Sequence, residues 1–154
     1  DHKEPDQKPA CRTWIKGGKK TQPTGQCLCG EISYQITGDP VAAGVCHCKN
    51  CQRQGGSAFS TLWGIARTAI QFAGATPKCY VDGDTASGGQ VSRYFCGNCG
   101  SALYSEGRQP DVLYLKTGTL DDTTSFSPAF HVWVDSNQSW VDLPDDVAQV
   151  ATQM

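Results

Sequence analysis

Nine of the 154 residues are cysteines, and seven of them fall into three short groups. Cys27 and Cys29 form the first group, and Cys96 and Cys99 form the last. Close cysteine spacing in a chain of ordinary length is more typical of metal binding than of the disulfide framework of a short secreted protein. The four thiolates together complete a closed tetrahedral shell, which is the arrangement of a structural zinc ion. We therefore expect this four-cysteine cluster to join two distant strands and to contribute to folding.

Each pair in the four-cysteine cluster has a spacing that lets both sulfurs reach one ion. Residues two apart in an extended segment face the same side, so we expect Cys27 and Cys29 to point together. The second pair forms a turn, for which Gly97 and Gly100 permit a positive φ, and Gly30 can serve the first pair likewise. The alternatives are redox dithiols or two disulfides. The first pair would then close a strained short ring, and no thioredoxin-like βαβ pattern surrounds the second pair.

The middle group, Cys46, Cys48 and Cys51, offers three sulfurs within six residues and has no obvious fourth partner. Three protein ligands with an exchangeable fourth position distinguish a catalytic zinc site from a structural one. We expect this three-cysteine cluster to hold a second zinc ion. In the alternative interpretation Cys11 or Cys79 closes the shell. Cys11 lies in an expected extension, and Cys79 lies in an expected strand, where a free cysteine commonly packs as a small buried hydrophobe.

The charge of the three-cysteine cluster indicates what an open position would do. Three thiolates leave a divalent ion with a net negative charge, so the site is soft and a weaker Lewis acid than a histidine-ligated zinc. A thiol suits such a site, because coordination removes its proton near neutral pH and holds a nucleophile in place. The expected reaction is the attack of a small thiol on an aldehyde carbonyl, or the reverse cleavage of a thiohemiacetal. Activation of water is the competing use.

Three polar residues are candidates for supporting roles. The side chain of His47 should point away from the sulfurs on either side of it, so we expect it to support the site from behind or to face solvent. His131 lies in an alternating strand and is a candidate proton relay, with a purely structural role as the alternative. Arg53 follows the three-cysteine cluster and could pair with a substrate carboxylate or offset the charge of the metal centre. Three tryptophans could line a pocket: Trp63, Trp133 and Trp140. We expect at least two of them to pack in the core instead.

The elements that position these groups are expected to be mostly strands in a single domain of residues 25–154. Residues 1–24 are rich in lysine and proline and poor in apolar side chains, so we expect a flexible extension. A short helix is predicted over Lys49–Arg53, and a second in the tail after Pro144. Short β-branched and aromatic runs separated by turn residues predict the strands: Glu31–Gly38, Phe59–Ala66, Lys78–Val81, Val91–Phe95, Ala102–Ser105, Val112–Thr117 and Phe130–Val134.

The charge and hydropathy of the chain exclude several partners. It carries 13 basic and 15 acidic side chains and has a pI near 5.9, so no uniform positive field favours nucleic acid or an anionic membrane surface. The longest apolar stretches, such as Val41–Val45, are far shorter than the roughly 20 residues that span a bilayer. The cysteine usage favours a reducing, cytoplasmic compartment. A secreted chain that has lost its leader is the alternative.

Five motifs in chain order resemble the family of glutathione-dependent formaldehyde-activating enzymes and centromere protein V. The resemblance extends from Gly25 to about Val147. The motifs are Gly25 to Gly30 followed by Tyr34, Cys46 to Arg53 followed by Gly55 to Ser57, Phe95 to Ser101, Gly118 to Asp122, and His131 to Asp135 with Trp140.

This resemblance implies an all-β fold of tent-like, zinc-stapled antiparallel sheets. It also implies a structural zinc on Cys27, Cys29, Cys96 and Cys99 and a more labile zinc on the positions of the three-cysteine cluster. The implied activity is that of a carbon–sulfur lyase, in which glutathione condenses with formaldehyde to S-(hydroxymethyl)glutathione and the adduct is cleaved in reverse.

The leading hypothesis is therefore a zinc-dependent carbon–sulfur lyase acting on glutathione adducts, through the three-cysteine cluster with His131 and Arg53 as further candidates. Its expected partners are a small-molecule thiol and a carbonyl or thioether substrate. The sequence is also compatible with an oligomer of the chain. The carbon skeleton could instead belong to a larger metabolite. A non-catalytic zinc-bearing interaction module is the main alternative, and a redox or zinc-buffer protein is the third.

Overall fold

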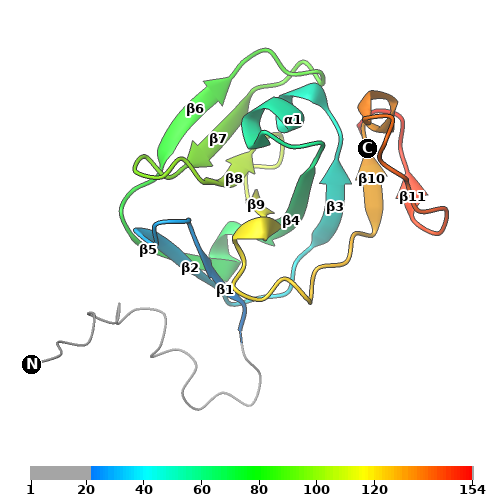
Figure 1. Cartoon of the computed structure of the whole chain (residues 1–154). Coiled ribbons are helices and arrows are strands. Elements are labelled where there is room, and N and C mark those ends of the chain that lie inside the picture. The colour runs from blue at the N-terminus through cyan, green and yellow to red at the C-terminus, as the bar shows by residue number, and fades with distance from the viewer. Residues whose placement is uncertain (1–21, 154) are drawn as a thin grey trace, which may run out of the picture.

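The computed structural model describes residues 22–153, which form eleven strands, one α-helix and three short 3-10 helices. The strands make two sheets, and Figure 1 shows the smaller sheet packed beneath the curved larger one. The smaller sheet has the order β1 (Thr24–Gln26), β2 (Ile32–Ile36), β5 (Ile70–Gly74). The larger sheet has the order β11 (Ala148–Gln149), β10 (Phe130–Val132), β3 (Ala42–Cys46), β4 (Ser60–Ala66), β9 (Val112–Lys116), β8 (Ala102–Glu106), β7 (Val91–Phe95), β6 (Lys78–Asp82).

The helices are short and lie between strands. Helix α1 (Lys49–Gly55) follows β3, and the 3-10 helices are η1 (Arg67–Ala69), η2 (Thr117–Thr119) and η3 (Val134–Ser136). None of the described helices has both the length and the apolar composition needed to cross a membrane. The flexible extension expected over residues 1–24, including Cys11, falls outside the described residues except for residues 22–24.

The mostly β architecture with little helix is confirmed, and each of the seven predicted strands is present. The helix predicted over Lys49–Arg53 is α1. The helix predicted after Pro144 is wrong, because the tail instead pairs along β10 as β11, with Val150 N donating to His131 O at 2.8 Å. The larger sheet is also not wholly antiparallel, since β10 runs parallel to both β3 and β11.

The main core lies between the two sheets. Tyr34 and Ile36 of β2 pack there with Trp63 and Ile65 of β4 and with Leu115 of β9. These residues alternate along their strands with the residues of the opposite face, as a half-buried strand requires. The odd-numbered side chains of β4 and β9 therefore fill the core, and the even-numbered ones cover the other face of the larger sheet. That other face carries the candidate functional site.

The strand register places a glycine where an aromatic ring needs room. Gly44 of β3 is opposite Leu62 of β4 on one side and Phe130 of β10 on the other. A Cβ added at Gly44 would overlap the ring of Phe130. The missing side chain of Gly44 therefore allows this ring to lie across the sheet.

Gly44→Ala is expected to lower the free energy of unfolding by about 1–3 kcal/mol, because the added methyl group displaces Phe130. Gly118→Ala is the matched control. A Cβ there has no neighbour within 4 Å, so its effect should stay within about 0.5 kcal/mol. Urea denaturation of both variants measures the difference. Equal stabilities would show that the ring of Phe130 moves without cost.

Candidate functional site

The four-cysteine cluster lies where the two sheets meet. Cys27 and Cys29 belong to the connection from β1 to β2 in the smaller sheet, and Cys96 and Cys99 follow β7 in the larger sheet. Their four sulfurs all lie within 4.8 Å of one another. The sulfur of Cys29 is 3.6 Å from that of Cys27 and 3.8 Å from that of Cys96. These four residues could therefore hold one metal ion between the sheets.

The spacing of these sulfurs fits zinc. A tetrahedron of thiolates about 2.3 Å from a central zinc ion has sulfur–sulfur edges of about 3.8 Å. The two distances from Cys29 match this edge, and they are far too long for disulfides. The donor set and its spacing therefore agree with the structural metal site expected from the sequence.

Two turns bring the four sulfurs together. The extended segment predicted for the first pair is wrong. Cys27 and Cys29 lie in a turn instead, which is closed by a hydrogen bond from Gly30 N to Cys27 O at 3.1 Å. Gly30 and Gly100 have positive φ values of 76° and 80°, which confirms the expected use of glycine at both turns. Gly97 has no positive φ and instead lies against the side chain of Lys78.

The local environment gives the thiols of the four-cysteine cluster different pKa values. Burial raises the pKa of Cys27 to about 11, although the backbone N–H of Ile32 lies 3.4 Å from its sulfur and favours the thiolate. Hydrogen bonds from the side chain and backbone of Ser101 lower the pKa of Cys99 to about 5. Ser101 also accepts a hydrogen bond from Leu28 N at 2.9 Å, so it links the two turns.

The three-cysteine cluster forms where β3 ends and α1 begins. Cys46 is the last residue of β3, Cys48 caps the N-terminus of α1, and Cys51 lies in its first turn. All three are buried, and their sulfurs lie within 4.8 Å of one another. Cys51 N donates to the sulfur of Cys48 at 3.3 Å. These three sulfurs could therefore bind one metal ion as soft ligands.

No fourth sulfur of residues 22–153 joins the three-cysteine cluster. Cys79 lies in β6, as predicted, but its side chain is exposed instead of packing as a buried hydrophobe. It is therefore not the closing ligand of the alternative interpretation. Cys11, the other candidate for that role, lies outside the described residues.

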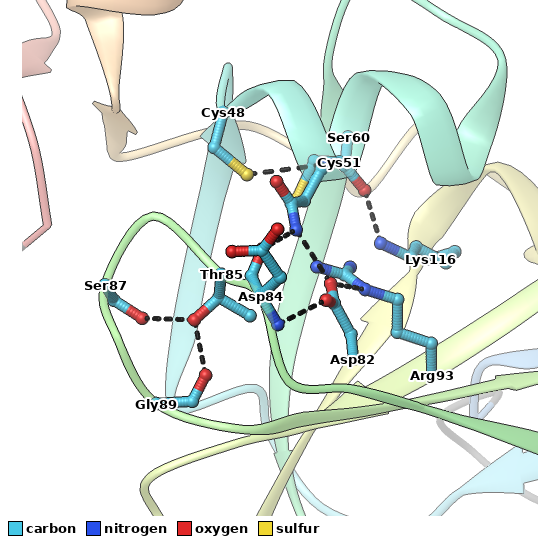
Figure 2. A network of polar contacts seen from close by, with 11 residues as sticks. Cys48, Cys51, Ser60, Asp82, Asp84, Thr85, Ser87, Gly89, Arg93 and Lys116 are labelled. Carbon is cyan, nitrogen blue, oxygen red and sulfur yellow. Dashed lines mark hydrogen bonds and ion pairs between the residues drawn. The ribbon is translucent and has the colours of Figure 1, made fainter.

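Two buried cations lie beside the three-cysteine cluster, and Figure 2 shows both. Lys116, at the end of β9, donates from Nζ to Ser60 Oγ at 2.7 Å. Arg93, in the middle of β7, donates from Nε to Asp82 Oδ2 at 2.9 Å. Asn50 of α1 also donates to that carboxylate, at 2.9 Å. These contacts hold β6, β7 and α1 around the sulfurs.

The cations and the neighbouring sulfurs favour a thiolate at Cys51. Hydrogen bonding from Cys46 and Cys48 lowers the pKa of Cys51 to about 2, against the effect of burial, and the charges of Lys116 and Arg93 act in the same direction. Contact with the other two sulfurs raises the pKa of Cys46. Burial lowers the pKa of Lys116, and the charge of Cys51 opposes that shift. The negative charge of the Cys51 thiolate and the positive charges of Lys116 and Arg93 therefore stabilise one another.

A cavity of about 720 Å³ opens over the three-cysteine cluster, and all three cysteines line it. Its volume lies within the range of roughly 300–1,000 Å³ that is typical of small-molecule sites. The even-numbered face of β3 and β4 forms its floor, with Gly44, Leu62 and Gly64. The connection between β6 and β7 forms part of its rim. A small molecule in this cavity would meet the three sulfurs directly.

His47 and His131 pair with each other and do not line the cavity. Both are buried, with His47 Nε2 2.8 Å from His131 Nδ1 and the two rings stacked. His47 points away from the sulfurs but does not face solvent. Burial lowers the pKa of both rings, so both favour the neutral form. Arg53 lies on the exposed side of α1, also outside the cavity lining.

Sequence reasoning missed several residues that surround the three-cysteine cluster. Arg93 shares a strand face with Val91 and Phe95, and a charge within such a run is a signal of a buried ion pair. Lys116 ends the apolar run of β9 in a similar way. Arg108 also lines the cavity, and nothing in the sequence around it indicates this. Of the three candidate tryptophans, Trp133 lines the cavity, Trp63 lies in the core and Trp140 is exposed.

Comparisons with known proteins agree with this arrangement. A crystal structure of a Rhodobacter sphaeroides protein is similar to this chain, with a TM-score of 0.50 and 18% sequence identity over 64% of this chain and 87% of that chain. That similarity supports the fold. No curated protein matches the chain significantly. The family model described as glutathione-dependent formaldehyde-activating enzyme matches residues 22–136. Because this match covers most of the chain and includes every cysteine of both clusters, the chain belongs to the family of glutathione-dependent formaldehyde-activating enzymes.

Proposed function

We propose that this protein is a zinc-dependent carbon–sulfur lyase that forms and cleaves adducts of glutathione with a carbonyl compound. The four-cysteine cluster would hold a structural zinc ion and the three-cysteine cluster a second one. The observation that carries the proposal is the position of Cys46, Cys48 and Cys51, three buried sulfurs that line a cavity of small-molecule size. Family membership supports glutathione and an aldehyde as the substrate class. A cytoplasmic, reducing compartment suits sites made of thiolates.

The proposed reaction is an addition and its reverse. In the forward direction the glutathione sulfur bonds to the carbonyl carbon, the π electrons of the carbonyl move to its oxygen, and the proton that leaves the sulfur ends on that oxygen. Cleavage returns the proton and breaks the carbon–sulfur bond. A zinc ion on the three-cysteine cluster would supply the positive charge that lowers the pKa of the incoming thiol.

The residues around the three-cysteine cluster have separate tasks in this proposal. Lys116 and Arg93 offset the negative charge of the cysteine thiolates, so that a further thiolate can approach. Asp82 keeps Arg93 in position through their 2.9 Å ion pair. At the rim, Arg108 donates from Nη2 to Ser87 O at 3.2 Å, and both residues line the cavity. In this proposal its guanidinium would bind a carboxylate of glutathione.

His131 and Arg53, the other site residues expected from the sequence, have weaker support for contact with a substrate. His131 reaches its neighbour His47 but does not line the cavity. Its position fits a residue that sets the orientation of the segment between Cys46 and Cys48 from behind. Arg53 is at the exposed side of α1 and is placed to act only through the overall charge of the site.

The test is the exchange between free and adducted formaldehyde, followed by NMR at equilibrium with glutathione. The zinc-loaded full chain is expected to accelerate this exchange by at least about a hundredfold over the same solution without protein. 2-Mercaptoethanol is the matched control thiol. It lacks the carboxylates that Arg108 would bind, so its exchange should be accelerated far less. If the protein accelerated the exchange of glutathione with neither formaldehyde nor a bulkier aldehyde, the proposed activity would be contradicted.

A further inference from the structure

The cavity has two walls of different chemistry. Polar side chains from the β6–β7 connection and from the segment after β8 line one side: Thr85, Ser87, Gln90, Arg108 and Gln109. Apolar side chains from β4, β10 and the adjoining segments line the other: Val41, Leu62, Phe130, Val132 and Trp133. A ligand that fills this cavity would therefore need a polar part and an apolar part.

The apolar wall begins directly at the three sulfurs. Leu62, Val132 and Trp133 pack against the three-cysteine cluster itself. The register explains this placement, because Val132 of β10 is opposite Cys46 of β3. The group bonded to the reacting carbon, one atom beyond the substrate sulfur, would therefore meet these three side chains first.

Trp133 is held in this wall by an uncommon backbone conformation. Its φ of 57° is the only positive φ of a non-glycine residue in the described part of the chain. Hydrogen bonds fix this conformation, since Trp133 N donates to Thr152 O at 3.1 Å and Trp133 O accepts from Ser136 N at 3.0 Å. Such strained residues gather at functional sites. The conformation places the indole at the cavity and against the sulfurs.

A second aromatic ring extends the wall. Phe130 lines the cavity, and its ring occupies the space that a side chain at Gly44 would take. Besides its oxygen, formaldehyde offers only hydrogen atoms at the reacting carbon and would leave Phe130 and Trp133 in contact with water. An apolar substituent would cover both rings and gain the free energy of burial.

We propose, on the basis of the proposed function, that the substrate of this site is a glutathione adduct whose sulfur-bearing carbon carries an apolar substituent the size of an aromatic ring. The peptide part of glutathione lies along the polar wall, with a carboxylate at Arg108. The apolar substituent lies against Leu62, Phe130 and Trp133. The chemistry at the sulfur is the same addition and cleavage as described above.

Two stable conjugates test this assignment without turnover. S-benzylglutathione and S-methylglutathione share the peptide part and differ only in the group that would meet the apolar wall. Titration calorimetry with the zinc-loaded full chain should show that the benzyl conjugate binds at least about tenfold more tightly. Equal dissociation constants would overturn the assignment and leave the proposed function standing. Absence of binding by both conjugates and by glutathione would overturn the glutathione premise, and the assignment with it.

The variant Trp133→Gly locates the preference in the wall. Glycine adopts the left-handed conformation without strain, so the backbone is retained when the indole is removed. The preference for the benzyl conjugate should fall to about threefold or less. Trp140→Gly is the matched control, because Trp140 is exposed and lies outside the cavity lining, and its preference should equal that of the wild type. Leu62→Ala is a second variant of the apolar wall, and it should also reduce the preference for the benzyl conjugate. An unchanged preference in both wall variants would contradict the proposal.

Discussion

Replacing Cys48 with alanine is expected to abolish turnover of glutathione adducts while the fold is retained. The substitution leaves two sulfurs, Cys46 and Cys51, which cannot hold a soft divalent ion as three thiolates do. We expect the exchange rate with glutathione and an aldehyde to fall by at least about a hundredfold. The cap of α1 is lost as well, which costs about 1 kcal/mol, so the melting temperature should fall by only a few degrees.

The control for this prediction is Cys79→Ala. It removes an exposed sulfur that belongs to neither cluster, so rate and melting temperature should match those of the wild type. Metal analysis should give about one equivalent less zinc in Cys48→Ala and no change in Cys79→Ala. Wild-type turnover in a folded Cys48→Ala protein would refute the assignment of chemistry to the three-cysteine cluster.

Replacing Cys96 with alanine is expected to have the largest effect on folding. Cys96 is almost completely buried, with 1% of its surface exposed, and belongs to the cluster between the two sheets. Structural zinc sites made of thiolates contribute about 10–16 kcal/mol to folding. Native domains of this kind are stable by only about 5–15 kcal/mol. Loss of one ligand should therefore prevent cooperative folding at 25 °C, a temperature at which Cys48→Ala stays folded.

Circular dichroism and amide NMR spectra distinguish the two clusters. Cys96→Ala should lose the dispersion of its amide signals, and a strong chelator that strips metal from the four-cysteine cluster of the wild type should have the same effect. Cys99→Ala should behave like Cys96→Ala, because both sulfurs belong to the same shell. A cooperative unfolding transition in Cys96→Ala near that of the wild type would show that packing alone joins the sheets.

The cysteine spacing by itself determined the two cysteine pairs and the three-cysteine cluster, because short-range ligand geometry is encoded locally, whereas the meeting of the two pairs depends on how the two sheets pack. Cys96 and Cys99 bring two sulfurs together in one turn, and Cys46, Cys48 and Cys51 bring three together across one strand end and one helical turn. The strands with clear alternation, such as Val91–Phe95, were also predictable, since burial of one face imposes a period of two. Strand β3 was missed because its small residues Ala42, Ala43 and Gly44 show no such alternation.

The surroundings of the sulfurs depended on contacts between residues far apart in the chain. Lys116 and Arg93 come from strands at different places in the larger sheet, and only the strand register brings them to Cys51. The partner of His131 was not predictable, because a strand pattern does not show which side chain lies opposite. His47 meets it only through the parallel pairing of β10 with β3.

The sequence thus determined which atoms can bind a metal, and the tertiary structure decided what can reach them. Each pair or triple of ligands is local, because a chelate needs residues a few positions apart. A cavity is not local, since its walls come from β3, β4, β10 and the β6–β7 connection, which are far apart in the chain. The presence of Trp133 and absence of Trp140 in that wall follow from packing and from one positive φ, which no spacing in the sequence encodes.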